Sequence, residues 1–195
     1  MRIILASKSP RRKEILENLG LKFDILVADA DERSDERDPR KRVADLATIK
    51  GRAVLDKVDN KKELLLVASD TLVYADGEFL GKPKDRDDAR RMIKMLSGKA
   101  HSVVSGIYIY CNGKEISASD ETKVVFDDMS ADEIENYISS DEPYDKAGGY
   151  AVQGLASLYI SGLEGDYFNV VGLPVNLMYK ILKKDFNIDI NDLRS

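Results

Sequence analysis

The sequence predicts a mixed α/β fold, in which a β-sheet carries flanking helices. Short apolar segments typical of strands alternate along the chain with longer segments whose apolar residues recur at helical spacing. Two turn sequences, Ala75-Asp76-Gly77 and Asn112-Gly113, are typical of β-hairpins. Because strands and helices alternate and one hairpin is long, we expect a mixed sheet. The 195 residues contain no obvious linker, so a single domain over residues 1–195 is expected.

The first elements follow from local residue preferences. The apolar run 3–6 predicts a short buried strand. The helix after it is expected to begin at Ser9, a good capping residue, because Pro10 suits the first helical position and Gly20 suits the end. Residues 23–27 predict a second strand.

The next segments lead to the centre of the predicted sheet. The densely charged segment 28–40 predicts a loop, and apolar residues at helical spacing predict a helix over 42–57. Residues 64–68 form the most apolar run and predict a central strand, after which the polar residues 69–71 follow. Strands at 72–74 and 78–80 flank the first hairpin turn.

The second half is expected to add long strands and three helices. A helix over 85–96 precedes two long strands, 102–110 and 116–126, which the Asn-Gly turn joins. Ser130 and Glu133 have the spacing of a capping box, so a helix should begin there and reach about residue 139. The remaining elements are a loop over 141–154, a short strand over 158–160 and a closing helix over 173–186.

The segment LASKSPRR, residues 5–12, joins the first strand to the first helix and has features that favour an anion. Free backbone N–H groups and the positive end of the helix dipole attract negative charge, and Ser7 and Ser9 add hydroxyl donors. Arg11 and Arg12 oppose the dipole in the first turn, a cost that suggests phosphate binding. The alternative is a capped helix with two solvated arginines.

Asp70 is the second candidate, within LLLVASDTLV. A buried strand is expected to deliver Asp70 to its carboxyl end between Ser69 and Thr71, where ligands bind in open α/β sheets. An aspartate there can bind a metal ion or act as a base on water. The alternative is an aspartate that merely ends the strand with an Asx turn.

Two loops carry further candidates. Lys82 lies between Gly81 and Pro83 in a stiff loop, where its charge suits phosphate, although a surface lysine in a turn is the alternative. Gln153 ends the glycine-bearing segment YDKAGGYAVQG, and its amide can read a base edge because it both donates and accepts. A structural turn is the alternative there. The segment 165–174 favours packing over ligand contact.

Composition excludes several classes of function. The net charge of −5 disfavours nucleic-acid binding, and no apolar run approaches the length of a membrane span. Cys111 is the only cysteine, which fits a cytoplasmic protein without intramolecular disulfides. His101 is the only histidine, so a catalytic triad or zinc cluster lacks material. The available metal ligands are oxygens, Glu32 among them, which favours Mg²⁺ or Mn²⁺.

Taken together, these segments resemble the Maf family of nucleoside triphosphate pyrophosphatases. The matching pieces occur in family order over nearly the whole chain: LASKSPRR, Lys50 within RVADLATIK, SDT at 69–71, GKP at 81–83, SGKAHSVVSG at 97–106, DKAGGYAVQG at 145–154 and GDYFNVVGLP at 165–174. The resemblance implies an elongated mixed sheet with a cleft between two lobes, as in the inosine triphosphate pyrophosphatases. It also implies hydrolysis of the α–β phosphoanhydride to a nucleoside monophosphate and pyrophosphate.

The resemblance further implies a role for each candidate residue. Asp70 is the implied general base, and Glu32 and Asp70 are the implied ligands of a divalent cation, Mg²⁺ or Mn²⁺. The implied phosphate-binding residues are Ser7, Ser9, Arg11, Arg12, Lys50 and Lys82. The positions linked to substrate choice are Arg12, Thr71 and Gln153. A homodimer is also implied.

The form AGGYAVQG is similar to the family branch that prefers dTTP and UTP, and modified pyrimidine triphosphates are included among the expected substrates. The branch that acts on 7-methyl-GTP has a different sequence in this loop and is the alternative enzyme. A non-catalytic nucleotide sensor or cell-division regulator is the alternative from another class. Loss of Asp70 or Lys82 would favour the sensor, and both residues are present.

Overall fold

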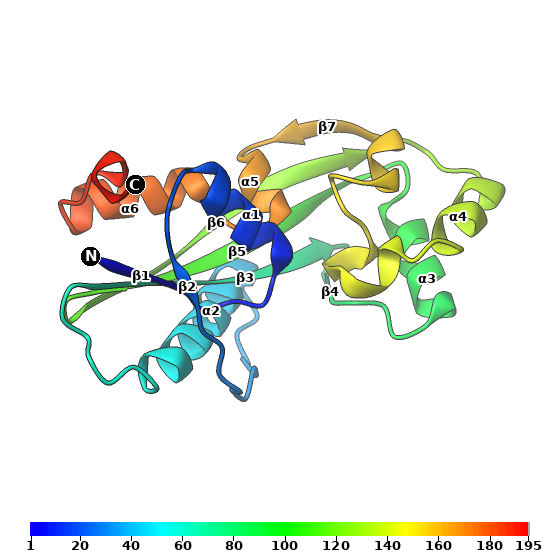
Figure 1. Cartoon of the computed structure of the whole chain (residues 1–195). Coiled ribbons are helices and arrows are strands. Elements are labelled where there is room, and N and C mark those ends of the chain that lie inside the picture. The colour runs from blue at the N-terminus through cyan, green and yellow to red at the C-terminus, as the bar shows by residue number, and fades with distance from the viewer. Residues whose placement is uncertain (195) are drawn as a thin grey trace. The chain divides into compact units, whose positions relative to one another are not determined.

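The structure is a computed structural model and describes residues 1–194 (Figure 1). Within these residues seven strands form one sheet in the order β2-β1-β3-β5-β6-β7, and β4 pairs with β3. Their bounds are β1 (Arg2–Leu5), β2 (Asp24–Ile25), β3 (Leu64–Ala75), β4 (Glu78–Leu80), β5 (Ala100–Cys111), β6 (Lys114–Phe126) and β7 (Ile160–Glu164). Both parallel and antiparallel pairs occur, which confirms the predicted mixed α/β class.

Helices connect and cover the strands. The α-helices are α1 (Pro10–Asn18), α2 (Pro39–Leu55), α3 (Arg86–Leu96), α4 (Ala131–Ile138), α5 (Tyr167–Val171) and α6 (Val175–Asp185). The part of the chain that the structure describes also has short 3-10 helices: η1 (Glu142–Asp145), η2 (Ala147–Gly149), η3 (Leu155–Leu158) and η4 (Ile190–Leu193).

The chain divides into two compact units. Unit 1 comprises residues 1–70, 105–120 and 172–195, and unit 2 comprises residues 71–104 and 121–171. Three of the strands, β3, β5 and β6, contribute residues to both units. The expectation of a single domain over residues 1–195 stays a prediction.

In unit 1, parallel strands are buried between helices. β1 pairs in parallel with β2 and with β3, where Leu5 lies opposite Val67. One face of these strands packs against α2 in a core cluster that includes Ile4, Ala47 and Leu66. Figure 1 shows α1 and α6 on the opposite side of the strands from α2. Burial on both faces explains why residues 64–68 are apolar without alternation.

Gly106 allows β5 to pass directly beneath α2. A Cβ atom at this position would lie 2.0 Å from the carbonyl oxygen of Val43, which belongs to the helix backbone. Backbone atoms cannot rotate away as the end of a side chain can, so any side chain here must push the helix off the strand. Gly106, the last residue of the SGKAHSVVSG motif, therefore has a packing role in unit 1.

We expect Gly106→Ala to lower the free energy of unfolding by about 3 kcal/mol or more, because the new methyl group overlaps the backbone of α2. Urea unfolding followed by circular dichroism measures the change. Gly81→Ala is the matched control, since a Cβ atom there has nothing within 4 Å. Equal stability of the two variants would contradict the packing role.

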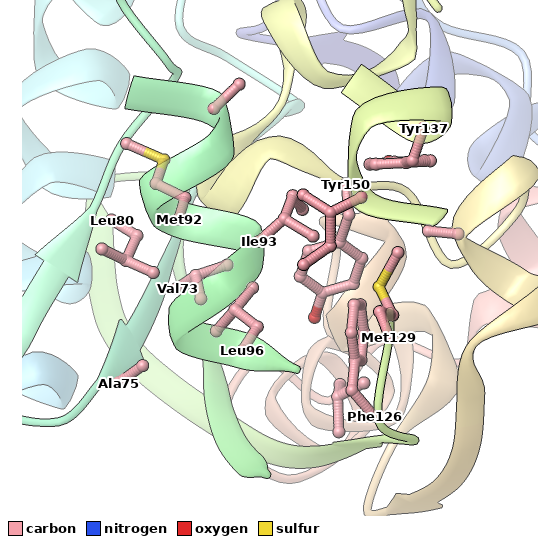
Figure 2. Packing of buried hydrophobic residues seen from close by; sticks show 14 of the residues in the cluster. Val73, Ala75, Leu80, Met92, Ile93, Leu96, Phe126, Met129, Tyr137 and Tyr150 are labelled. Carbon is pink, nitrogen blue, oxygen red and sulfur yellow. The ribbon is translucent and has the colours of Figure 1, made fainter. Parts of the chain in front are cut away.

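Unit 2 has its own core of aromatic and aliphatic side chains. The cluster joins α3 and α4 to the strand segments of this unit, and it includes Ile93, Phe126, Tyr137 and Tyr150. Figure 2 shows the ring of Tyr150 pointing into this cluster beside Phe126. The two ring centroids lie 4.9 Å apart in an edge-to-face arrangement.

Several local predictions are confirmed. Asp76 and Asn112 have φ angles of 48°, and the glycines that follow them are also in the left-handed region, as tight hairpin turns require. Ser130 and Glu133 form the expected capping box at the start of α4. Pro10 begins α1 as expected, and Gly20, with φ at 76°, follows its end.

Other boundaries differ from the predictions. α2 begins at Pro39 rather than residue 42, because Asp38 caps it by accepting from the backbone N–H groups of Arg40 and Lys41. β2 is shorter than 23–27, and β7 begins at Ile160, after the 3-10 turn η3. The short helix α5 lies within the segment for which only packing was expected.

The largest correction concerns β3. This strand was expected to end at residue 68, with Asp70 beyond its carboxyl end, but it continues without a break to Ala75. The residues after Asp70 are mostly β-branched, aliphatic or aromatic, and the strand's last residues pair with β4. β1 ends opposite Val67, so Asp70 lies past the end of its neighbour rather than past its own strand.

Candidate active site

The segment after β1 enters α1 by way of Ser7 and Ser9. The backbone N–H of Ala6 donates to the carbonyl of Val67, which holds this exit against β3. Ser9 occupies the N-cap position, but its side chain makes no capping hydrogen bond, contrary to the role that its identity predicts. Instead the hydroxyl of Ser7 accepts from the backbone N–H of Ser9 at 3.2 Å.

Arg12 is held by the backbone as well as by Ser7. Its Nε donates to the carbonyl oxygen of Gly172 at 2.7 Å, and its Nη1 donates to the Ser7 hydroxyl at 3.1 Å. The buried hydroxyl of Ser69 donates to the same Gly172 carbonyl at 3.0 Å. One carbonyl oxygen therefore orients a guanidinium group in the first turn of α1 and a serine on β3.

Burial and neighbouring charges affect Arg12 in opposite directions. Desolvation lowers the pKa of its guanidinium from the ordinary value, and the charge of Asp70 opposes this change. Arg11 lowers the pKa further through like-charge repulsion, and Glu32 raises it. An arginine stays charged at neutral pH, so Arg12 supplies fixed positive charge near Asp70.

Lys50 lies between two carboxylates. Its Nζ is 2.5 Å from Oδ1 of Asp70 and 3.0 Å from Oε2 of Glu32. The Asp70 side chain is 12% exposed and the Glu32 side chain 53% exposed, so the pair joins a buried carboxylate to an accessible one. The ion pairs draw residues from a loop, a helix and a strand to one place in unit 1.

The fold explains why these residues meet. β1 and β3 are parallel neighbours, so Ser7 after β1 and Asp70 on β3 lie toward the same end of the sheet. α2 packs across the same strands, and Lys50 extends from this helix to Asp70. The structure thus brings together Ser7, Arg12, Glu32, Lys50 and Asp70. Arg11 is the sequence neighbour of Arg12 in α1 and acts on its guanidinium by like-charge repulsion.

Three other candidates, Thr71, Lys82 and Gln153, lie in unit 2, whereas Ser9 is in unit 1. Thr71 follows Asp70 along β3 and is half-buried, whereas Lys82 and Gln153 are exposed. The Gly81 carbonyl accepts from the backbone N–H of Gly148 at 2.9 Å, which joins the GKP segment to the glycine-bearing loop. Within unit 2 the structure therefore connects the segments that carry Lys82 and Gln153.

Two carboxylates in unit 1, those of Glu32 and Asp70, are the groups that could hold a divalent cation. Among residues 1–194 no group of three or more His, Cys, Asp or Glu side chains is arranged to hold a metal ion. Glu32 and Asp70 nevertheless direct oxygens at one cationic group, the Lys50 ammonium. Mg²⁺ is commonly held by one or two carboxylates together with phosphate oxygens and water, so two ligands from the protein suffice.

Sequence reasoning missed two groups at this site. The Gly172 carbonyl orients both Arg12 and Ser69, although its segment had been assigned to packing alone. Ser69 had been considered only as a neighbour of Asp70. A backbone carbonyl carries no side-chain pattern, but the Gly-Leu-Pro sequence at residues 172–174 does indicate a local change of direction where such a carbonyl can be presented.

His101 is buried in unit 2 beside two aromatic side chains. Its Nε2 lies 2.6 Å from the Tyr150 hydroxyl, and its ring meets Phe126 edge to face. Burial lowers the pKa of His101 to about 4 and raises the pKa of the Tyr150 hydroxyl above its ordinary value.

The neutral imidazole of His101 predicts a loss of stability in acid. The unfolded chain takes up this proton below the ordinary histidine pKa of 6.5, whereas the folded chain does so only near pH 4. The contribution of the neutral His101 side chain to the free energy of unfolding is therefore complete above pH 6.5. It falls, by about 3 kcal/mol in all, as the pH drops to 4. Urea unfolding between these pH values should show a shallower pH dependence for His101→Gln than for the wild type. The same slope in both proteins would contradict this assignment.

Comparison with known proteins identifies relatives along nearly the whole chain. The family model described as Maf-like protein matches residues 2–185. A dTTP/UTP pyrophosphatase of Thermoanaerobacter sp. (strain X514) is 46% identical over 190 residues, which cover 96% of this chain and 98% of that protein. A protein of the same name from Pyrococcus abyssi is 49% identical over 186 residues, covering 94% and 96%. A third, from Thermosipho africanus, is 44% identical over 182 residues, covering 93% and 92%.

No helix in the described part of the chain has the length and apolar character needed to cross a membrane.

Proposed function

The chain belongs to the Maf family, and we propose that it is a nucleoside triphosphate pyrophosphatase that acts on dTTP and UTP. The observation that carries this proposal is the arrangement in unit 1, where Lys50 and Arg12 place positive charge beside the buried Asp70. The names of the relatives support the choice of substrate.

Positive charge and hydroxyl groups would bind the triphosphate. Arginine and lysine neutralise phosphate oxygens, and arginine can contact two of them at once. The proposed phosphate-binding residues are Ser7, Ser9, Arg11, Arg12, Lys50 and Lys82. Arg12 is held in place before substrate arrives, since the Gly172 carbonyl and Ser7 both accept from it. Such preorganisation lowers the cost of stabilising the charge that develops in the transition state.

Asp70 would act as the general base. The oxygen of one water forms a bond to a phosphorus of the α–β phosphoanhydride while the bridging P–O bond breaks, and the products are a nucleoside monophosphate and pyrophosphate. The Asp70 carboxylate takes the proton that the water loses, and its contact with Lys50 orients the carboxylate. Arg12 and Lys50 stabilise the negative charge on the phosphates during this step.

Glu32 and Asp70 would hold the Mg²⁺ or Mn²⁺ ion that we propose as cofactor. When bound, the ion supplies charge neutralisation for the phosphates and lowers the pKa of a bound water. Because Glu32 is exposed, its carboxylate could leave the Lys50 ammonium and bind a metal ion that enters with the substrate.

Nucleotide choice would depend on Arg12, Thr71 and Gln153. The Gln153 amide can donate to one base atom and accept from another, which suits the edge of a pyrimidine such as thymine or uracil. Its exposed position leaves the amide available to a ligand. A cytoplasmic location and a homodimer are further parts of the proposal.

Pyrophosphate release from the purified chain tests the function. The substrates are the canonical nucleoside triphosphates and 7-methyl-GTP, each with Mg²⁺, with Mn²⁺ and with a chelator. We expect release from dTTP and UTP that depends on the metal ion. Release from 7-methyl-GTP instead would move the chain to the other branch, and nucleotide binding without release would favour a nucleotide sensor.

A further inference from the structure

Glu142 lies against the loop that carries Gln153. Its Oε2 accepts from the backbone N–H of Leu155 at 2.7 Å, and its Oε1 accepts from the backbone N–H of Ala156 at 3.1 Å. The Tyr137 hydroxyl lies 2.9 Å from the same Oε1. These contacts hold the start of η3, two residues after Gln153, to a single carboxylate in unit 2.

Gly154 lets this carboxylate come close to the chain. A Cβ atom on Gly154 would lie only 2.2 Å from Oε2 of Glu142 and 2.6 Å from its Cδ. The residue directly after Gln153 therefore has to be glycine for the carboxylate to reach the two N–H groups. The Glu142 carboxylate thus packs closely against Gly154, the residue that follows Gln153.

The other end of the loop is also held. Tyr150 is buried, its hydroxyl lies 2.6 Å from His101, and its ring packs against Phe126. Figure 2 shows Tyr150 and Tyr137 within the same core cluster. Between Tyr150 and the N–H groups that Glu142 accepts lie only residues 151–154. Gln153 is therefore an exposed side chain on a short segment with both ends fixed.

We propose that Glu142 is a positioning residue for Gln153 and thereby a determinant of nucleotide choice. The inference rests on the proposed function for its effect on substrates, but the anchoring itself depends only on the contacts in unit 2. Glu142 does not need to touch the nucleotide. Its carboxylate fixes the backbone on which the Gln153 amide stands, so that the amide meets the base edge in one orientation.

The first test measures the anchor without any substrate. In Glu142→Gln the single amide oxygen of glutamine can accept from only one of the two backbone N–H groups. The NH₂ group then faces the other N–H, and two donors cannot form a hydrogen bond with each other. We expect amide hydrogen exchange at Leu155 and Ala156 to become roughly tenfold faster. Gly154→Ala is a second variant, because its methyl group displaces the carboxylate from the opposite side. Unchanged exchange at both amides in both variants overturns the inference.

Glu135→Gln is the matched control for the same chemical change. Glu135 lies on α4 in the same unit, and its ion-pair partners are Arg86 and Arg90 rather than residues of the Gln153 loop. Glu135→Gln weakens about as many hydrogen bonds to a carboxylate as Glu142→Gln does. It therefore shows whether loss of a carboxylate elsewhere in unit 2 is enough to speed exchange in the Gln153 loop. We expect it to leave exchange at Leu155 and Ala156 unchanged.

The second test measures nucleotide choice. We expect Glu142→Gln to lower the ratio of kcat/KM for dTTP over GTP about fivefold, whereas Glu135→Gln leaves the ratio unchanged. In a Gln153→Ala background the Glu142 substitution should cause no further change in the ratio, because it acts through Gln153. Proportional slowing of every nucleotide, or an undiminished effect without Gln153, overturns the inference.

The two tests separate failure of the inference from failure of the proposed function. A wild-type protein that releases no pyrophosphate overturns the proposed function and, with it, the effect of Glu142 on nucleotide choice. Faster exchange at Leu155 and Ala156 in that case still upholds the anchor. An active wild type with unchanged exchange overturns the anchor alone.

Discussion

Replacing Asp70 by asparagine is expected to lower the rate of pyrophosphate release about 10³-fold while nucleotide binding survives. Asparagine has the shape of aspartate but cannot take a proton from water. Lys50 keeps its contact with Glu32, so the positive charge that binds phosphates stays in place. Removing a negative charge next to the triphosphate favours binding, so loss of turnover with binding intact would report loss of a chemical role of Asp70, as the base or as a ligand of the cation. Pyrophosphate release and a nucleotide binding titration measure the two effects separately.

Asp76→Asn is the matched control for Asp70→Asn. Asp76 lies in the turn between β3 and β4, is exposed, and forms its ion pair with Lys99 rather than with a site residue. We expect wild-type rates from this variant. Turnover at the wild-type rate in Asp70→Asn would exclude Asp70 as the base. The arginines and lysines would then bind the nucleotide, but the proposed mechanism of hydrolysis would be wrong.

Replacing Lys50 by methionine is expected to lower kcat/KM for dTTP at least about 10²-fold, through both weaker binding and slower turnover. The substitution keeps much of the side-chain volume and removes the charge. The Lys50 ammonium then no longer lies between the carboxylates of Glu32 and Asp70. These two carboxylates and the triphosphate, all negatively charged, repel one another. Steady-state kinetics with dTTP measures kcat and KM for the variant.

Arg52→Met is the control for Lys50→Met, because it removes a positive charge from the same helix. Arg52 pairs with Glu115 and makes no contact with Asp70 or Glu32. We expect its kinetics to match the wild type. If Lys50→Met raises KM and leaves kcat unchanged, Lys50 binds the ground state only, and the proposal that it stabilises the transition state is wrong.

Much of the local structure could be predicted because the deciding contacts lie within a few residues. The capping box of Ser130 and Glu133 needs only its own turn of helix. The hairpin at Asn112 depends on the φ angles that asparagine and glycine tolerate. The start of α2 was missed because Asp38, its cap, lies inside a charged segment in which every position looks like a loop.

The continuation of β3 through Asp70 could not be predicted from local preferences. Polar residues at 69–71 resemble the end of a strand, and only pairing with neighbouring strands, β5 and β4, shows that the strand continues. The ion pairs of Lys50 with Asp70 and Glu32 likewise join residues from three separate elements. No local spacing relates such residues, so their meeting depends on how helix and strands pack.

The sequence by itself determined the mixed α/β class and the family, together with the identity of the residues that carry charge and hydroxyl groups. Residue type decides which groups can donate, accept or ionise, and such information is complete in the chain. Only the tertiary structure decided that the Gly172 carbonyl orients Arg12 and that the Glu142 carboxylate anchors the loop of Gln153. Both contacts use backbone groups, which every residue shares, so packing alone selects the ones that take part.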